Sequence, residues 1–155
     1  MKAIYPGSFD PFTLGHKAMV DKALKMFDAV VIAIGINDKK SNFLPLEKRL
    51  EMIRRIYEGN SKIEIISYRG LTVDYCTQHE IGVIIRGVRN FLDYEFERSI
   101  SNVNHTLSDQ VETILIMTPP ELSDISSSVV REFLFHGKSP MHFLPEEFNL
   151  EDFGL

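Results

Sequence analysis

Short apolar runs alternate with amphipathic stretches along this chain. Residues 2–5 favour β structure and end at Pro6-Gly7, whereas residues 29–36 are continuously apolar, as in a parallel strand covered on both faces. Between them, the apolar positions of residues 15–27 recur at helical spacing. These segments predict a strand, a helix and a second strand, which together form the βαβ unit of a parallel sheet.

The alternation continues toward the C-terminus. Further strands are predicted over residues 62–66, 82–85 and 111–117, and helices over residues 46–57, 71–79, 92–107 and from about Ser126 onward. The helix over residues 92–107 follows from a long amphipathic stripe formed by Leu92, Phe96, Ile100, Val103 and Leu107. Five strands separated by helices predict an α/β fold, Rossmann-like, with three α/β/α layers around a five-stranded parallel sheet.

Size and composition narrow the class of protein. A chain of 155 residues without a repeat or linker predicts a single domain over residues 1–155. Its net charge of −5 argues against a broad basic surface for nucleic acid, but a small anionic ligand needs only a local cluster of donors. Cys76 has no second cysteine to bridge to, so we expect a core thiol. With no signal peptide and no apolar run near the ~20 residues of a membrane helix, we expect a cytoplasmic protein without a membrane segment.

Residues that can carry chemistry follow four of the predicted strands. They lie in residues 5–8, 37–40, 86–89 and 118–128. In open parallel sheets, ligands bind outside the carboxyl ends of the strands, where the topology switches. We therefore expect these four segments to face a single crevice.

The first of these segments leads to Gly15-His16 at the start of a helix. Free backbone N–H groups and the positive end of the helix dipole suit phosphates there, and Ser8 adds a hydroxyl. Gly7 lets the backbone approach a ligand closely, and His16 can donate a charge-assisted hydrogen bond to an oxyanion. Taken alone, the same residues also fit a tight turn followed by a histidine.

Three later blocks add cationic and hydroxyl groups. Arg86 and Arg89 leave a strand end, where planar guanidinium groups suit phosphate, although most surface arginines are simply solvated. Residues 126–128 are serines that can cap a helix and also donate to phosphate. Lys39 and Lys40 lie in a polar loop, where a solvated charge is the alternative to a ligand.

Together these blocks resemble those of one family, the bacterial phosphopantetheine adenylyltransferases of the HxGH nucleotidyltransferase superfamily. The similar stretches are Thr13-Leu14-Gly15-His16, in the TxGH form of that branch, Ile85-Arg86-Gly87-Val88-Arg89, Ile125-Ser126-Ser127-Ser128-Val129-Val130-Arg131, and Lys39-Lys40 with Phe43. The resemblance runs from about Lys2 to Pro145 with the blocks in order. Ser8 departs from the threonine common at its position, and residues 146–155 are less recognisable.

The resemblance implies a nucleotidyltransferase domain with a defined reaction. The enzyme would transfer the adenylyl group of ATP to 4'-phosphopantetheine, giving dephospho-coenzyme A and pyrophosphate, as a pantetheine-phosphate adenylyltransferase (EC 2.7.7.3) of coenzyme A biosynthesis. The acceptor phosphate would attack directly, with Mg²⁺ as cofactor and no covalent enzyme intermediate. The resemblance also implies a homo-oligomer, in this case a homohexamer, and coenzyme A as a feedback inhibitor.

Site residues follow from the same resemblance. The catalytic set would be His16, Ser8, Lys40, Arg86, Arg89 and Ser127. ATP would be bound by Ser8, His16, Arg89 and Ser127 together with Tyr5, Phe9, Gly87, Val88, Glu97, Leu122, Ser123, Asp124, Ile125, Ser126 and Ser128. The acceptor would be bound by Ser8, Lys40, Thr72 and Arg86, with Lys39 as the alternative to Lys40. The metal ligands stay unassigned, and Asp10 is expected to cap its turn rather than to stand in the outer shell of the metal.

Two other functions stay open at this point. A nicotinate mononucleotide adenylyltransferase would use the same chemistry, but Thr13 and the block from Arg86 to Arg89 disfavour it. A non-catalytic nucleotide-sensing module on the same fold would bind ATP and form no pyrophosphate.

Overall fold

The structure is a computed structural model that describes all of residues 1–155. Its strands are β1 (Lys2–Gly7), β2 (Ala29–Ile36), β3 (Ile63–Arg69), β4 (Val83–Val88) and β5 (Glu112–Met117). Its α-helices are α1 (Leu14–Ala23), α2 (Leu46–Ile56), α3 (Thr72–Gln78), α4 (Phe91–Leu107) and α5 (Ser127–Phe135). Short 3-10 turns cover Pro120–Leu122, Met141–Phe143 and Leu150–Phe153.

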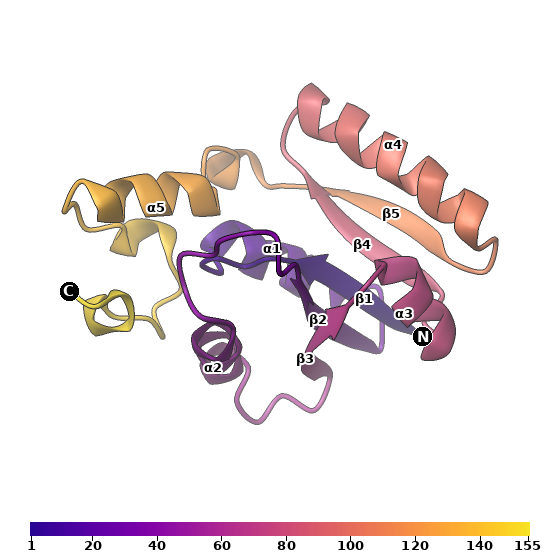
Figure 1. Ribbon diagram of the computed structural model, residues 1–155, viewed down its shortest axis with the longest axis horizontal. Coiled ribbons are helices and arrows are strands. Elements are labelled where there is room, and N and C mark those ends of the chain that lie inside the picture. The colour runs from indigo at the N-terminus through magenta and orange to yellow at the C-terminus, as the bar shows by residue number, and fades with distance from the viewer.

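All five strands form one parallel sheet in the order β3-β2-β1-β4-β5. The chain first builds outward from β1 through β2 to β3 and then returns to the other side of β1 with β4 (Figure 1). The switch point therefore lies between β1 and β4, where a crevice is expected at the carboxyl ends of the strands. The predicted five-stranded parallel sheet is confirmed, although β1, β3 and β4 run two or three residues further than the sequence indicated.

The sheet is covered on both faces because successive strand residues point to opposite sides. Ala3, Val30, Ile32 and Ile85 face a core shared with α1, α2 and α5. Ile4, Val31, Ala33 and Ile84 face a second core that includes Val73 and Cys76 of α3. Cys76 is a fully buried thiol, as predicted, and burial raises its pKa to about 11.

Helix α4 packs on β4 and β5, but the side chains on its less exposed face are polar. Its less exposed positions are Asp93, Glu97, Ser101 and Asn104, which recur at helical spacing, and Glu95. The apolar stripe predicted from the sequence lies on the opposite side, and Leu92 and Phe96 are 78% and 62% exposed. The sequence stripe thus marks a helix correctly, but it does not face this chain's own sheet.

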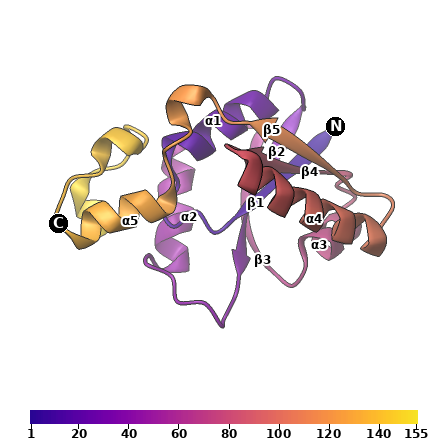
Figure 2. The same cartoon turned by 90° about the horizontal axis from the view of Figure 1, so that it is seen from above.

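The C-terminal segment packs against α2. Asp152 is buried and forms ion pairs with Lys48 and Arg55, while Phe148 enters the larger core. Figures 1 and 2 show α5 and this segment at one end of the molecule and α4 with β5 at the other. None of the helices has the length and apolar character needed to cross a bilayer.

Candidate active site

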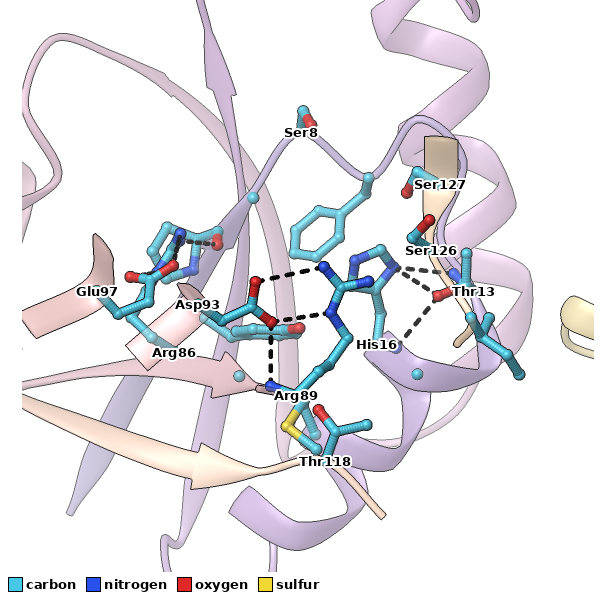
Figure 3. A pocket seen from close by; sticks show the side chains of 18 residues that line it. Ser8, Thr13, His16, Arg86, Arg89, Asp93, Glu97, Thr118, Ser126 and Ser127 are labelled. Atoms are coloured by element: carbon cyan, nitrogen blue, oxygen red, sulfur yellow. Dashed lines mark hydrogen bonds and ion pairs between the residues drawn. The ribbon is translucent and has the colours of Figure 1, made fainter. Parts of the chain in front are cut away.

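A cavity of about 290 Å³ opens at the switch point between β1 and β4. Side chains from β1, α1, β4, α4 and the start of α5 converge on it (Figure 3). Eleven residues expected from the sequence line it: Tyr5, Ser8, Phe9, His16, Arg86, Gly87, Arg89, Glu97, Ile125, Ser126 and Ser127. Three of the four segments predicted to share a crevice are therefore brought together here.

The turn after β1 is compact because an aromatic ring folds back over a glycine. A Cβ atom at Gly7 would lie 2.8 Å from the ring of Phe9, so a larger residue there would displace the ring. Phe9 itself has φ 46°, in the left-handed region that non-glycine residues seldom adopt. The ring of Phe9 also meets the rings of Tyr5 and His16 edge-on, which fills the floor of the cavity.

Thr13 and His16 form a reciprocal cap at the start of α1. The backbone N–H of His16 donates to Thr13 Oγ1 at 3.4 Å, and the backbone N–H of Thr13 donates to His16 Nδ1 at 3.0 Å. Since Nδ1 accepts a hydrogen bond from the backbone, the ring proton of neutral His16 belongs on Nε2. The backbone N–H of Thr13 thus fixes the tautomer of the histidine, and the Thr13 hydroxyl caps the first turn of α1 beside it.

His16 is neutral in the free protein. Burial, followed by the charges of Arg89 and Arg86, lowers its pKa from an ordinary 6.5 to about 4. The hydrogen bond expected from His16 to an oxyanion therefore does not take its charge from the imidazole, because the fold places the ring among two arginines. Nε2 donates as a neutral N–H, and the charge of a bound phosphate would supply the ionic character of that hydrogen bond.

Arg86 is held by Glu97 of α4. Its Nε and Nη2 each lie 2.7 Å from a carboxylate oxygen of Glu97, and its Nη1 donates to the carbonyl of Pro6 at 2.9 Å (Figure 3). Burial favours the neutral form of Arg86, but the hydrogen bonds and charge of Glu97 outweigh it and raise the pKa of the guanidinium. Arg86 is thus a fixed cation at the carboxyl end of β4.

Arg89 is paired with Asp93, a residue that sequence reasoning missed. Arg89 Nε lies 2.9 Å from the carboxylate of Asp93, which also accepts from the Arg89 backbone N–H. Burial would raise the pKa of Asp93, but the bonds from Arg89 lower it. Asp93 is the acidic residue in the first turn of α4 after the N-cap Asn90, and this pattern at a helix start was its sequence signal.

The serines at the start of α5 combine capping with contacts to the first turn. Ser126 is the N-cap, and its hydroxyl accepts from the Val129 backbone N–H at 3.2 Å. The Ser127 hydroxyl donates to the Pro11 carbonyl at 2.8 Å. The predicted cap is therefore formed by Ser126, and Ser126 and Ser127 both line the first cavity.

A second cavity, of about 660 Å³, adjoins the first and holds Lys40. Ser8 and Ser127 line both cavities, and Arg131 and Ser128 line the second. Lys40 also lines a third cavity beside it, whereas Lys39 lines none of these three. Of the two lysines, the geometry favours Lys40. The expectation that residues 37–40 share one crevice with the other segments is corrected, because Asn37, Asp38 and Lys40 border the adjoining cavities and not the first.

Several expected residues lie away from the cavities. Val88 is buried, and Leu122, Ser123 and Asp124 line neither the first nor the second cavity. The Thr72 hydroxyl lies 2.6 Å from the Tyr68 hydroxyl beside β3. Asp10 is structural, but it does not cap its own turn: its carboxylate accepts the backbone N–H groups of Phe43 and Leu44.

The donor set of the site suits polyanions. The first cavity presents two guanidinium groups, an imidazole N–H and several hydroxyls, and its two carboxylates, Asp93 and Glu97, are each paired with an arginine. No group of three or more His, Cys, Asp or Glu side chains is arranged to hold a metal ion. Such a site can hold phosphate groups and stabilise charge that develops on them.

Comparison with known proteins identifies the family. The family model described as "Cytidylyltransferase-like" matches residues 4–133. The chain is 47% identical to the phosphopantetheine adenylyltransferase of Bacteroides thetaiotaomicron over 94% of this chain and 95% of that protein. It is 45% identical to that of Porphyromonas gingivalis, over 96% and 97% of the two chains, and 41% identical to that of Leptospira biflexa, over 93% and 90%.

A solved structure supports the fold. The bifunctional NMN adenylyltransferase/ADP ribose pyrophosphatase of Francisella tularensis superposes with a TM-score of 0.71 over 92% of this chain and 44% of that longer chain, at 15% identity. At that identity the likeness concerns the fold alone. The sequence relatives, the matching family model and the arrangement of the cavity agree with the motifs, and the chain belongs to the phosphopantetheine adenylyltransferase family of the cytidylyltransferase-like proteins.

Proposed function

We propose that this chain, as a phosphopantetheine adenylyltransferase, binds ATP in the first cavity and the phosphate of 4'-phosphopantetheine where the two cavities meet. The observation that carries the proposal is that Ser8 and Ser127 line both cavities, with His16, Arg86 and Arg89 on one side and Lys40 on the other. The products are dephospho-coenzyme A and pyrophosphate. We propose that residues 1–155 act as a single domain. We also propose that the protein works in the cytoplasm, where ATP is available.

The nucleotide side of the site is proposed to hold ATP by its phosphates. His16 Nε2 and the hydroxyl of Ser8 donate near the α-phosphate, and Arg89 and Ser127 bind the β- and γ-phosphates. Tyr5, Phe9, Gly87, Glu97 and residues 122–128 shape the rest of the nucleotide site. Burial keeps Tyr5 a neutral phenol by raising its pKa, so it adds no negative charge beside the phosphates.

The acceptor side is proposed to align the attacking phosphate. Lys40 and Arg86 hold the phosphate of 4'-phosphopantetheine from two sides, with Ser8 between them, and Thr72 contacts the pantetheine arm. Because the acceptor is already an anion, no general base or protein nucleophile is needed, and the oxygen attacks the α-phosphorus in line with the departing pyrophosphate. The fixed cations then stabilise the charge that grows on pyrophosphate.

The side chains of this site suit a Mg²⁺ ion that is bound through the phosphates of the nucleotide. The carboxylates of the first cavity are already engaged with arginines, and Asp10 is engaged with backbone N–H groups. A Mg²⁺ ion usually keeps several waters and binds through substrate phosphates, where it neutralises their charge. We therefore propose that Mg²⁺ enters on the phosphates of ATP.

We also propose that copies of this chain assemble through α4, as a homohexamer. Its exposed stripe of Leu92, Phe96, Ile100, Val103 and Leu107 has no cover within the chain. A continuous apolar face of this kind marks an interaction surface, and because the inward face of α4 is polar, the apolar one is free for a second copy. Light scattering should show an oligomer that Phe96→Asp dissociates and that Met26→Asp, at an exposed position after α1, leaves intact. A wild-type monomer would refute the assembly.

Coenzyme A carries the same phosphopantetheine arm as the acceptor. We propose that it inhibits by occupying the acceptor side. Inhibition should then be competitive with 4'-phosphopantetheine, and Lys40→Ala should weaken it. Unchanged inhibition of that variant would place coenzyme A elsewhere.

A coupled assay of pyrophosphate release tests the proposed activity. With ATP and Mg²⁺, pyrophosphate should form with 4'-phosphopantetheine and not with nicotinate mononucleotide. Release only with nicotinate mononucleotide would assign the alternative enzyme. ATP binding without pyrophosphate formation in either case would indicate a nucleotide sensor.

A further inference from the structure

We infer that Asp10 and Arg49 are positioning residues that set the spacing between the nucleotide side and the acceptor side of the site. Both are charged and nearly fully buried, at 5% and 4% exposure. Neither lines the first cavity, whereas Asp10 borders the second and Arg49 the third. The inference rests on the proposed function, because it concerns how the two substrates are aligned for adenylyl transfer.

Asp10 ties the turn after β1 to the loop that carries Lys40. Its Oδ2 accepts the Phe43 backbone N–H at 2.7 Å, and its Oδ1 accepts the Leu44 backbone N–H at 2.8 Å. Asp10 lies two residues after Ser8, and Phe43 lies three residues after Lys40. One carboxylate therefore fixes the loop of the acceptor lysine against the turn that holds Ser8 and Phe9.

Arg49 of α2 joins the same two segments from the other side. Its Nη1 donates to the Ser8 carbonyl at 2.7 Å, and its Nε donates to the Leu44 carbonyl at 3.1 Å. Burial lowers the pKa of Arg49, and the charge of Asp10 opposes that shift. Two buried opposite charges thus hold one pair of loops by four hydrogen bonds to backbone groups.

The turn needs such support because its backbone is not relaxed. Phe9 lies between Ser8 and Asp10 at φ 46°, a conformation that persists in folded proteins only where the surroundings hold it. Arg131 adds a further anchor by donating to the Asp10 carbonyl at 2.7 Å. The positions of the Ser8 hydroxyl and the Phe9 amide are therefore set by the same contacts that place the lysine loop.

The consequence for catalysis is a matter of alignment. A direct attack needs the acceptor oxygen close to the α-phosphorus and in line with the leaving group, and a displacement of about 1 Å can cost about 100-fold in rate. Loosening the loop of Lys40 should therefore reduce acceptor use and turnover while ATP still binds in the first cavity.

The experiment compares Asp10→Asn and Arg49→Lys with two matched controls, Asp74→Asn on α3 and Arg54→Lys on α2, both at exposed positions. Asp10→Asn places an NH₂ group against a backbone N–H, and Arg49→Lys keeps the charge but can serve only one of the two carbonyls. Steady-state kinetics with both substrates, ATP binding by calorimetry and thermal melting are measured for each. Arg49→Lys keeps the test available if Asp10→Asn does not fold.

We expect each of the two variants to lower kcat/KM for 4'-phosphopantetheine by about tenfold or more while the Kd for ATP changes less than about threefold. In a Lys40→Ala background the same substitutions should cost much less, because the lysine they position is gone. Equal losses for ATP and acceptor, fully additive effects with Lys40→Ala, or unchanged kinetics would overturn the inference. A wild-type protein that forms no pyrophosphate would instead overturn the proposed function.

Discussion

The ion pair between Arg86 and Glu97 offers a direct test of how the site is held together. Glu97→Gln keeps the shape of the side chain but removes its charge and turns one acceptor oxygen into an NH₂ donor facing the guanidinium. Two hydrogen bonds of 2.7 Å are affected. The carboxylate is nearly fully buried, whereas the Arg86 side chain is 28% exposed to the cavity.

The size of the effect follows from that burial. Breaking a fully buried ion pair costs about 3–5 kcal/mol in the free energy of unfolding, because the remaining charge loses its partner. The partial exposure of Arg86 lets water replace some of the lost interaction, so we expect about 2–3 kcal/mol. For a chain of this length, that corresponds to a decrease in Tm of about 5–10 °C.

Thermal unfolding followed by circular dichroism measures this change, with Glu95→Gln as the control. Glu95 lies on the same helix and pairs with Arg98 at 3.1 Å, but both of those side chains are more than 40% exposed. The control should change stability by less than about 0.5 kcal/mol. If Glu97→Gln and Glu95→Gln had the same small effect, Glu97 would not anchor Arg86 in the way described.

Three further results are expected. His16→Ala should lower kcat about 100-fold or more with a much smaller change in the Kd for ATP, since the Nε2 hydrogen bond strengthens as charge develops; equal losses of both would remove that role. Lys40→Ala should raise KM for 4'-phosphopantetheine more than KM for ATP, and a defect confined to ATP would reassign the lysine. NMR titration should give His16 a pKa near 4, and a value near 6.5 would refute its burial among the arginines. Because the folded-state pKa is lowered, the unfolded chain takes up this proton first, so the stability contribution of His16 is complete above about pH 6.5 and declines as the pH falls toward 4.

The fold was largely predictable from local patterns. Continuous apolar runs such as residues 29–36 mark central strands wherever both faces are covered, and Ser126 marks the start of α5 as its N-cap. The amphipathic stripe of α4 correctly predicts a helix. Periodicity alone does not tell whether an apolar face packs on the chain's own sheet or meets another copy. Only the folded structure shows that the apolar face of α4 is exposed.

The site was predictable where motifs follow strand ends and less so where distant segments meet. The pairing of Asp10 with Phe43 and Leu44 joins residues more than 30 positions apart, which no local spacing reveals. The neutral state of His16 was missed for the same reason, because Arg86 and Arg89 approach its ring only in the folded chain. Asp93 could have been found from its place in the first turn of α4, after the N-cap Asn90.

The most direct test of adenylyl transfer by a two-substrate crevice follows the α-phosphorus itself. Purified protein is incubated with ATP labelled at the α-phosphorus, with Mg²⁺, and with or without 4'-phosphopantetheine, and the products are separated by chromatography. We predict that the label moves to dephospho-coenzyme A only when the acceptor is present and that the protein never carries it. Labelled protein, or exchange of pyrophosphate into ATP without acceptor, would contradict direct attack by the acceptor phosphate.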